Sequence, residues 1–192
     1  MKAVTFSYRD FLRLRENLSK AKYVLRNIMK VKAKQTNSRD CIICGLDNPN
    51  GVKANFYSME DGSCVALFQF KPEHQSYPNR THGGLITAIL DETIGRAIWV
   101  DSPEVWGVTM KITVEFHKPA PYGKPLKCVG RITKQTRLTF EGTGELFDEN
   151  GVLLERAYAT YFRLPFSQAT GDASLHTEEL NILVPDDVTE IN

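Results

Sequence analysis

Two features that could act on a carbonyl group lie close together in residues 82–100, which read HGGLITAILDETIGRAIWV. His82-Gly83-Gly84 begins a segment of helical length, so backbone N–H groups without bulky side chains are exposed at its start. Asp91 interrupts the apolar run, and a carboxylate there costs free energy unless something nearby pairs with it or uses it. Such donors polarise a carbonyl, and the carboxylate can serve as a general base or nucleophile.

A hydroxyl that orients water would complete such a site, and Thr109 opens the alternating run TMKITVEFHKP. Gly83 and Asp91 are eight residues apart, which is about 12 Å along one helix. They therefore cannot serve one carbonyl from the same helix. Two antiparallel copies could bring Gly83 of one copy to Asp91 of the other, so the sequence predicts a site shared by a homodimer.

Three polar neighbours of Asp91 and Gly83 are expected to have supporting roles. Glu92 points about 100° away from Asp91 on a helix, so it is expected to support the site or face an interface. Arg96 follows Asp91 by five residues, which is poor helical spacing for an ion pair. His82 is expected to fix the loop by a hydrogen bond rather than to act as a nucleophile.

The elements that must position these residues follow from hydrophobic periodicity. The apolar segment predicts a helix at about residues 83–99, and alternation predicts strands around it. One helix among five or six antiparallel strands indicates an α+β fold in which the sheet curls around a central helix. The predicted strands are Val52–Met59, Cys64–Phe70, Val105–His117, Leu126–Lys134, Thr136–Leu146 and Val152–Phe162.

Charge divides the chain into three parts. Residues 1–40 carry about +8, residues 41–166 about −1 and residues 167–192 about −6. Apolar residues recur every three or four positions from Phe11 to Ile28, which predicts an additional amphipathic helix in a basic N-terminal arm. Packing against the body or a twin subunit is favoured for this helix, and a membrane-surface or anion-binding role stays open. Lys30–Arg39 is expected to be a linker, and residues 167–192 a loosely attached acidic tail.

Composition narrows the class of protein. The 192 residues, 42% of them hydrophobic and 24% charged, fit one globular domain with appendages. A net charge of +1 does not call for a nucleic-acid partner, and no apolar run is long enough to cross a membrane. Four cysteines do not indicate a secreted disulfide scaffold. The reducing cytoplasm is therefore expected, with a mitochondrial transit peptide left open because the N-terminal arm is basic.

Three motifs in combination resemble the hotdog-fold acyl-CoA thioesterases of the phenylacetate-degradation type, in the 4-hydroxybenzoyl-CoA thioesterase superfamily. They are CxxCGxDNPxG, HGGxxxxxxDE and TxxxTVEFxKPxPxG, and the resemblance covers residues 41–163. It implies a hotdog fold, paired subunits with two active sites across the interface, and a dimer of dimers as an alternative assembly. It also implies hydrolysis of an acyl-CoA to a free acid and coenzyme A, with no metal and no redox cofactor.

The resemblance assigns roles residue by residue. Asp91 matches the general base or nucleophile, and Thr109 the residue that helps to hold the attacking water. Gly83 matches the backbone donor to the thioester oxygen, flanked by His82 and Gly84. The polar residue that assists at the carbonyl from upstream of the HGG motif is left open among Gln75, Ser76 and Asn79.

Coenzyme A carries phosphates, which need cations near the mouth of a pocket. Arg131, Lys134 and Arg137 are candidates because they lie in or beside one predicted strand, although strand edges carry such charges routinely. A non-catalytic module that binds acyl-CoA or an acyl carrier is the alternative function. The buried carboxylate and Thr109 argue against it, because a pure binder has no need of them.

Cys41 and Cys44 have the spacing of half of a zinc knuckle. The other possible ligands show no ligand-like spacing, so small buried residues in a turn are expected and no metal is predicted. The run GLDNPNG resembles part of a hotdog hydratase motif but lacks the catalytic histidine, which disfavours a hydratase. The cysteines and histidines without such spacing are Cys64, Cys128, His74 and His176.

Overall fold

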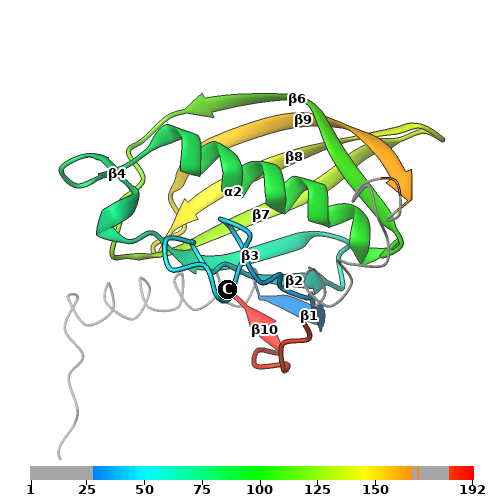
Figure 1. Ribbon diagram of the computed structural model, residues 1–192, viewed down its shortest axis with the longest axis horizontal. Coiled ribbons are helices and arrows are strands. Elements are labelled where there is room, and N and C mark those ends of the chain that lie inside the picture. Colours follow the sequence, from blue (N-terminus) through cyan, green and yellow to red (C-terminus); the bar gives the residue numbers. More distant parts are fainter. Residues whose placement is uncertain (1–27, 166–167, 169–181) are drawn as a thin grey trace, which may run out of the picture.

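A single long helix lies across a strongly curved antiparallel sheet in the computed structural model, which describes residues 28–165, 168 and 182–192 (Figure 1). The helix α2 spans Gly83–Arg96 and continues as the 3₁₀ turn η2, Ala97–Val100. The eight strands of the sheet follow the order β10-β1-β2-β3-β7-β8-β9-β6. This confirms the predicted α+β arrangement of a central helix wrapped by a sheet.

The strands match the predicted alternation closely, and most turns fall at the predicted glycine-, proline- and asparagine-rich breaks. A small separate hairpin precedes α2 and follows the 3₁₀ turn η1, Pro72–His74. None of the helices within the described ranges is long and apolar enough to cross a membrane. The strands are β1 Met29–Lys34, β2 Asn55–Met59, β3 Cys64–Gln69, β4 Gln75–Tyr77, β5 Arg80–Thr81, β6 Val105–Phe116, β7 Pro125–Gln135, β8 Thr139–Asp148, β9 Leu153–Pro165 and β10 Glu190–Ile191.

The helix packs very close to the middle of the sheet. Ile89, Leu90 and Ile94 are fully buried between α2 and the strands. A Cβ on Gly130 of β7 would overlap the backbone of α2, and one on Gly142 of β8 would overlap the side chain of Ile94. Glycine at these two positions therefore allows the close approach, and the position of α2 relative to the sheet is fixed by direct contact.

The structure differs from the sequence-based expectation at both ends of the described chain. Met29–Lys34 was expected to lie where the N-terminal arm passes into a linker. It instead forms β1, which pairs with β2. Glu190–Ile191, expected to belong to a loose tail, forms β10 and pairs with β1. The difference arises because apolar residues alternate with lysines in this segment. Met29 and Val31 pack against a second hydrophobic cluster, which includes Ile191.

Opposite charges reinforce this attachment, since Lys34 Nζ lies 2.6 Å from a carboxylate oxygen of Asp187. Ile28, the last residue of the predicted amphipathic stripe, is not helical. The remainder of that predicted helix lies outside the described residues.

Glu155 of β9 is a buried carboxyl group inside the curved sheet. It lies opposite Leu146 of β8 and Phe116 of β6, its side chain is almost completely buried, and its Oε2 atom has no hydrogen-bond partner among the described residues. Burial raises the pKa of Glu155 to about 8. The group is therefore held neutral near pH 7, where it would be ionised in the unfolded chain.

Glu155 is expected to make the protein less stable as the pH rises. The folded state keeps the proton up to a pKa of about 8, whereas the unfolded state loses it near 4.5, so this contribution to stability declines as pH rises through that window. In the wild type this effect lowers the free energy of unfolding between pH 5 and pH 9. We expect the decrease to be about 2–3 kcal/mol smaller in Glu155→Gln, allowing for partial solvent screening. Urea unfolding at the two pH values measures it. Glu149→Gln, at an exposed site, is the control, and an equal pH dependence in both variants would contradict the prediction.

Candidate active site

The carboxylate of Asp91 lies on α2 and is held by two hydroxyl groups from the sheet. Thr109 Oγ1 donates to Asp91 and lies 3.0 and 3.1 Å from its two carboxylate oxygens. The Tyr161 hydroxyl lies 2.9 Å from Asp91 Oδ1 and 2.9 Å from its backbone carbonyl oxygen. The carboxylate therefore has a fixed orientation, with Thr109 and Tyr161 on the sheet side of the helix.

A β-bulge brings Thr109 to this face. Ile112 and Val114 of β6 pack against the core, so simple alternation would turn Thr109 away from the helix. The register between β6 and β9 shifts between Thr109 and Lys111, which leaves Met110 as the extra residue. Thr109 consequently pairs with Tyr161, and both side chains reach Asp91.

Burial raises the pKa of Asp91 above its ordinary value, and the hydrogen bonds from Tyr161 and Thr109 partly oppose this effect. Burial and the nearby Asp91 raise the pKa of Tyr161 far above its ordinary value, so its hydroxyl remains protonated and donates. A carboxylate with a raised pKa is, when ionised, a stronger base than a free aspartate. The environment therefore suits Asp91 to accept a proton from water.

Tyr161→Phe is expected to raise the pKa of Asp91, because it removes a hydrogen bond that favours the charged form. Activity that needs the ionised carboxylate is lost as the pH falls through its pKa. We therefore expect the acidic limb of the kcat/KM profile to move about 0.5–1 pH unit higher. Tyr158→Phe, an exposed position on the same strand, is the control. An unchanged acidic limb in Tyr161→Phe would contradict the role given to this hydroxyl.

The start of α2 is organised by His82, as the sequence predicts. Its Nδ1 atom accepts the backbone N–H of Gly84 at 2.9 Å, so His82 caps the helix. Within the described residues the Gly83 N–H makes no hydrogen bond. It points along the positive end of the helix and is a donor for an external oxygen.

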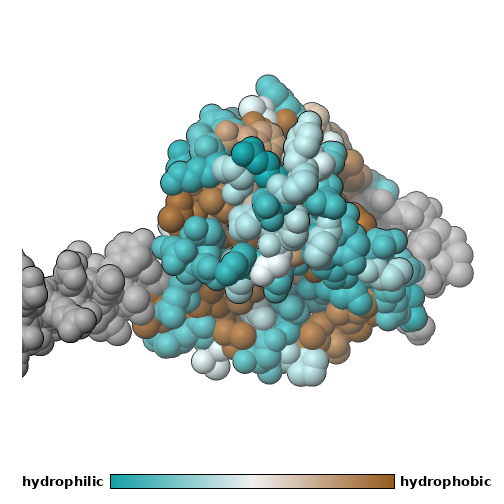
Figure 2. Space-filling view, turned by 90° about the vertical axis from the view of Figure 1, so that its left-hand side faces the viewer, coloured by the Kyte–Doolittle hydropathy of each residue, from teal (hydrophilic) through white to brown (hydrophobic). Residues whose placement is uncertain are grey.

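The three polar candidates upstream of α2 all lie in or beside the β4–β5 hairpin. Gln75 and Ser76 are exposed on β4, and Asn79 occupies the turn with a φ of 64°. The hairpin projects beyond the N-terminal end of α2 (Figure 1). The face of the molecule on this side is largely hydrophilic with separate hydrophobic patches (Figure 2). The role of each candidate at a carbonyl stays a prediction.

The cationic candidates do not gather around Asp91 of the same chain. Arg131 forms an ion pair with Asp61 at 3.2 Å, and Lys134 forms one with Glu141 at 3.3 Å. Arg131 faces outward because its neighbour Gly130 faces α2, and Lys134 faces outward because a bulge after Ile132 pairs it with Glu141, the neighbour of the inward-facing Gly142. Arg137 lies in the turn between β7 and β8. Their assignment to coenzyme A stays a prediction.

Two interactions near Asp91 were not anticipated from the sequence. Tyr161 lies 70 positions away and carries no motif, so only the register of β9 reveals its contact with Asp91. Arg96 is buried and pairs with Glu92, with Nε 2.8 Å from Oε1. The spacing of four residues is the favourable helical spacing for such a pair, and it could have been recognised.

Comparisons with known proteins agree with this architecture. Residues 79–155 match the family model described as the thioesterase superfamily, a segment that includes Asp91 and Thr109 and ends before Tyr161. A thioesterase superfamily protein of known crystal structure superposes with a TM-score of 0.60 at 18% identity, covering 82% of this chain and 85% of that one. A hypothetical thioesterase from Streptococcus pneumoniae, crystallised with coenzyme A, has a TM-score of 0.53 at 21% identity, covering 58% of this chain and 86% of that one.

An uncharacterized protein of Schizosaccharomyces pombe is 30% identical over 98 residues. The match covers 50% of this chain and 56% of the relative, so the chain spans little more than half the length of that relative. The fold and the matched segment confirm the resemblance noted in the sequence. The chain therefore has the fold of the hotdog thioesterases, and its residues 79–155 are similar to the thioesterase superfamily.

Proposed function

We propose that the protein hydrolyses acyl-CoA thioesters, with Asp91 as the catalytic carboxylate. The observation that carries this proposal is the carboxylate itself, which interrupts a buried helix and is oriented by Thr109 and Tyr161. The structure of a related hypothetical thioesterase with coenzyme A supports the choice of an acyl-CoA as substrate. The proposed reaction needs no metal and no redox cofactor.

The proposed active unit is a homodimer. Strand β6 is an edge of the sheet, 12 residues long, and pairs only with β9 within the described residues. Val108 and Met110 on this strand are exposed hydrophobic residues. A long apolar edge strand of this kind pairs readily with another chain, and an antiparallel pair of β6 strands would align two copies of α2.

Each proposed site combines Asp91 and Thr109 of one copy with Gly83 of the other. A water molecule held by Thr109 and Asp91 gives a proton to the carboxylate and attacks the thioester carbonyl carbon. The Gly83 N–H of the second copy donates to the oxygen that becomes negative. The carbon–sulfur bond then breaks, and the coenzyme A thiolate leaves and takes up a proton. Direct attack by Asp91 on the carbonyl is the alternative route for the same residues.

Release of free thiol from a panel of acyl-CoAs of different chain length and aromaticity tests the proposed activity. Turnover of at least one member is the expected result. Tight binding of an acyl-CoA without thiol release over hours would instead favour the non-catalytic binding module and would overturn the proposal.

A further inference from the structure

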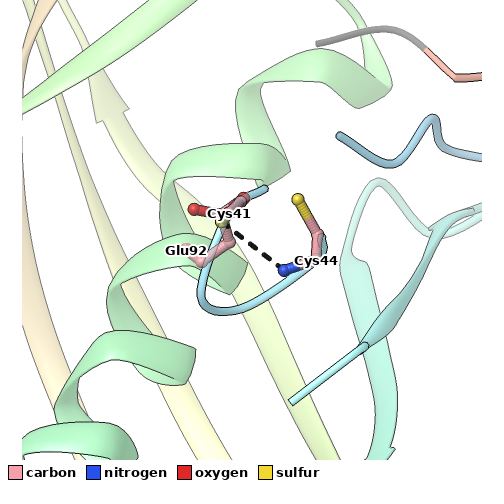
Figure 3. Close-up of side chains that lie close together, drawn as sticks. All are labelled: Cys41, Cys44 and Glu92. Carbon is pink, nitrogen blue, oxygen red and sulfur yellow. Dashed lines mark hydrogen bonds between the residues drawn. The ribbon is translucent and has the colours of Figure 1, made fainter. Parts of the chain in front are cut away.

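Another side of α2 carries a cluster of possible metal ligands that the proposed hydrolysis does not use. Cys41 and Cys44 lie in the loop before β2, and Glu92 lies on the helix next to Asp91 (Figure 3). The two sulfur atoms and a carboxylate oxygen of Glu92 all lie within 4.8 Å of one another. Tetrahedral zinc separates its ligand atoms by about 3.3–3.8 Å, so a small closure of the cluster would satisfy its geometry.

The cysteine loop is built like a metal-binding knuckle. Cys41 Sγ accepts backbone N–H groups from Ile43 at 3.3 Å and from Cys44 at 3.5 Å. The Gly45 N–H closes the turn on the Cys41 carbonyl oxygen at 2.9 Å, and a Cβ on Gly45 would overlap the backbone of Cys41. N–H donors around a sulfur stabilise the thiolate, which is the form that binds a metal.

Arg96 holds the other two members of the cluster, Cys44 and Glu92, in place. Its guanidinium group is buried and donates to Glu92 Oε1 at 2.8 Å and to Cys44 Sγ at 3.2 Å. It also donates to the carbonyl oxygen of Thr36 at 2.9 Å, which ties the chain before the loop to the same point. Outer donors of this kind orient the ligands of a metal and are part of the site.

The charges favour a divalent cation. Two thiolates and the Glu92 carboxylate carry three negative charges, and Arg96 supplies one positive charge. A divalent ion would bring the whole group to neutrality, which matters because Cys44 and Arg96 are buried. Two sulfur ligands and one carboxylate suit zinc rather than magnesium or calcium.

We propose that Cys41, Cys44 and Glu92 bind a zinc ion, with water as the fourth ligand. The ion fastens the cysteine loop to α2 at the residue next to Asp91, so its role is to hold the helix and loop together. The sequence alone disfavours a metal because no other cysteine or histidine has suitable spacing. The third ligand in the structure is a glutamate 48 positions after Cys44, which no spacing rule for cysteine and histidine detects.

Cobalt(II) binding to the full-length protein tests the site directly. After chelation under reducing conditions, we expect one Co²⁺ per chain, with thiolate-to-cobalt charge-transfer absorption and the intense visible bands of tetrahedral coordination. One equivalent of Zn²⁺ should displace it. Cys44→Ser should abolish the charge-transfer band of a two-thiolate site or reduce it by about half, and Glu92→Gln should weaken zinc binding by about 10-fold or more. Cys128→Ala, a buried cysteine outside the cluster, is the matched control.

Glu92→Gln preserves an oxygen acceptor for Arg96, so it separates ligand loss from unfolding, which circular dichroism monitors. Three results would overturn the proposal: no charge-transfer band in the wild type, an unchanged cobalt spectrum in Cys44→Ser, or zinc affinity unaffected by Glu92→Gln. A Cys41–Cys44 disulfide that forms readily in air while the reduced protein takes up no metal would identify a redox pair instead. None of these readouts depends on thioesterase activity, so the site can fail while the proposed hydrolysis holds.

Discussion

Asp91→Asn is expected to lower kcat/KM for acyl-CoA hydrolysis by about 10²–10⁴-fold, the usual loss when one general base is removed. Asparagine has nearly the same shape and its side-chain oxygen can still accept from Thr109 and Tyr161, which hold the carboxylate at 2.9–3.1 Å. The fold should therefore persist. Thiol release under saturating and limiting substrate measures the change in kcat and in kcat/KM.

Asp101→Asn is the matched control, because Asp101 follows η2 and is exposed in a long ion pair with Lys32. It should leave the rate within about two-fold of wild type, since exposed ion pairs contribute little. Full activity of Asp91→Asn on the best substrate would show that the carboxylate is not the catalytic base or nucleophile.

Gly83→Pro is expected to reduce activity by about 10²–10³-fold, because it deletes one donor to the developing oxyanion. Proline is tolerated at the first position of a helix, and His82 already has the extended backbone that must precede it, with φ −66° and ψ 129°. Gly83→Ala keeps the N–H and serves as the control. A Cβ there would lie 3.6 Å from the ring of Phe116, an ordinary contact.

Mixed dimers test whether the two residues act across an interface. A heterodimer of one Gly83→Pro subunit and one Asp91→Asn subunit should contain one intact site and recover about half of the wild-type activity, while each parent homodimer remains inactive. Differently tagged subunits allow the heterodimer to be purified. A heterodimer as inactive as its parents, or an active species that sediments as a monomer, would contradict a shared site.

The central part of the fold could be predicted because its patterns are local. The apolar run after His82 and the alternation in Val105–Phe116 each determine an element without help from distant residues. Strand β1 could not be recognised in the same way, because its apolar residues alternate with lysines and gain their partners only in β2 and β10. Its register depends on contacts across more than 100 residues, which a single segment does not encode.

The candidate site was predictable in part for the same reason. Asp91 and Gly83 belong to one local motif, and Thr109 follows within 20 residues. Their residue types and spacing were therefore enough to predict that they belong to one site. Tyr161 and the bulge at Met110 arise from the pairing of β6 with β9. The short distance between Cys41 and Glu92 depends on how a loop folds back onto α2, which the sequence does not specify by any periodicity.

The close contact of α2 with β7 and β8 limits where the acyl part of a substrate can lie. Gly130 and Gly142 let α2 lie close to the sheet, and buried side chains such as that of Ile94 fill the layer between them. For the proposed reaction we therefore expect the acyl group to run along the side of α2 that faces away from the sheet, where the second copy of the proposed dimer would form the opposite wall. Both subunits of a homodimer carry the same sequence, so one substitution in the gene would change the wall of both sites and the acyl chain length that each accepts.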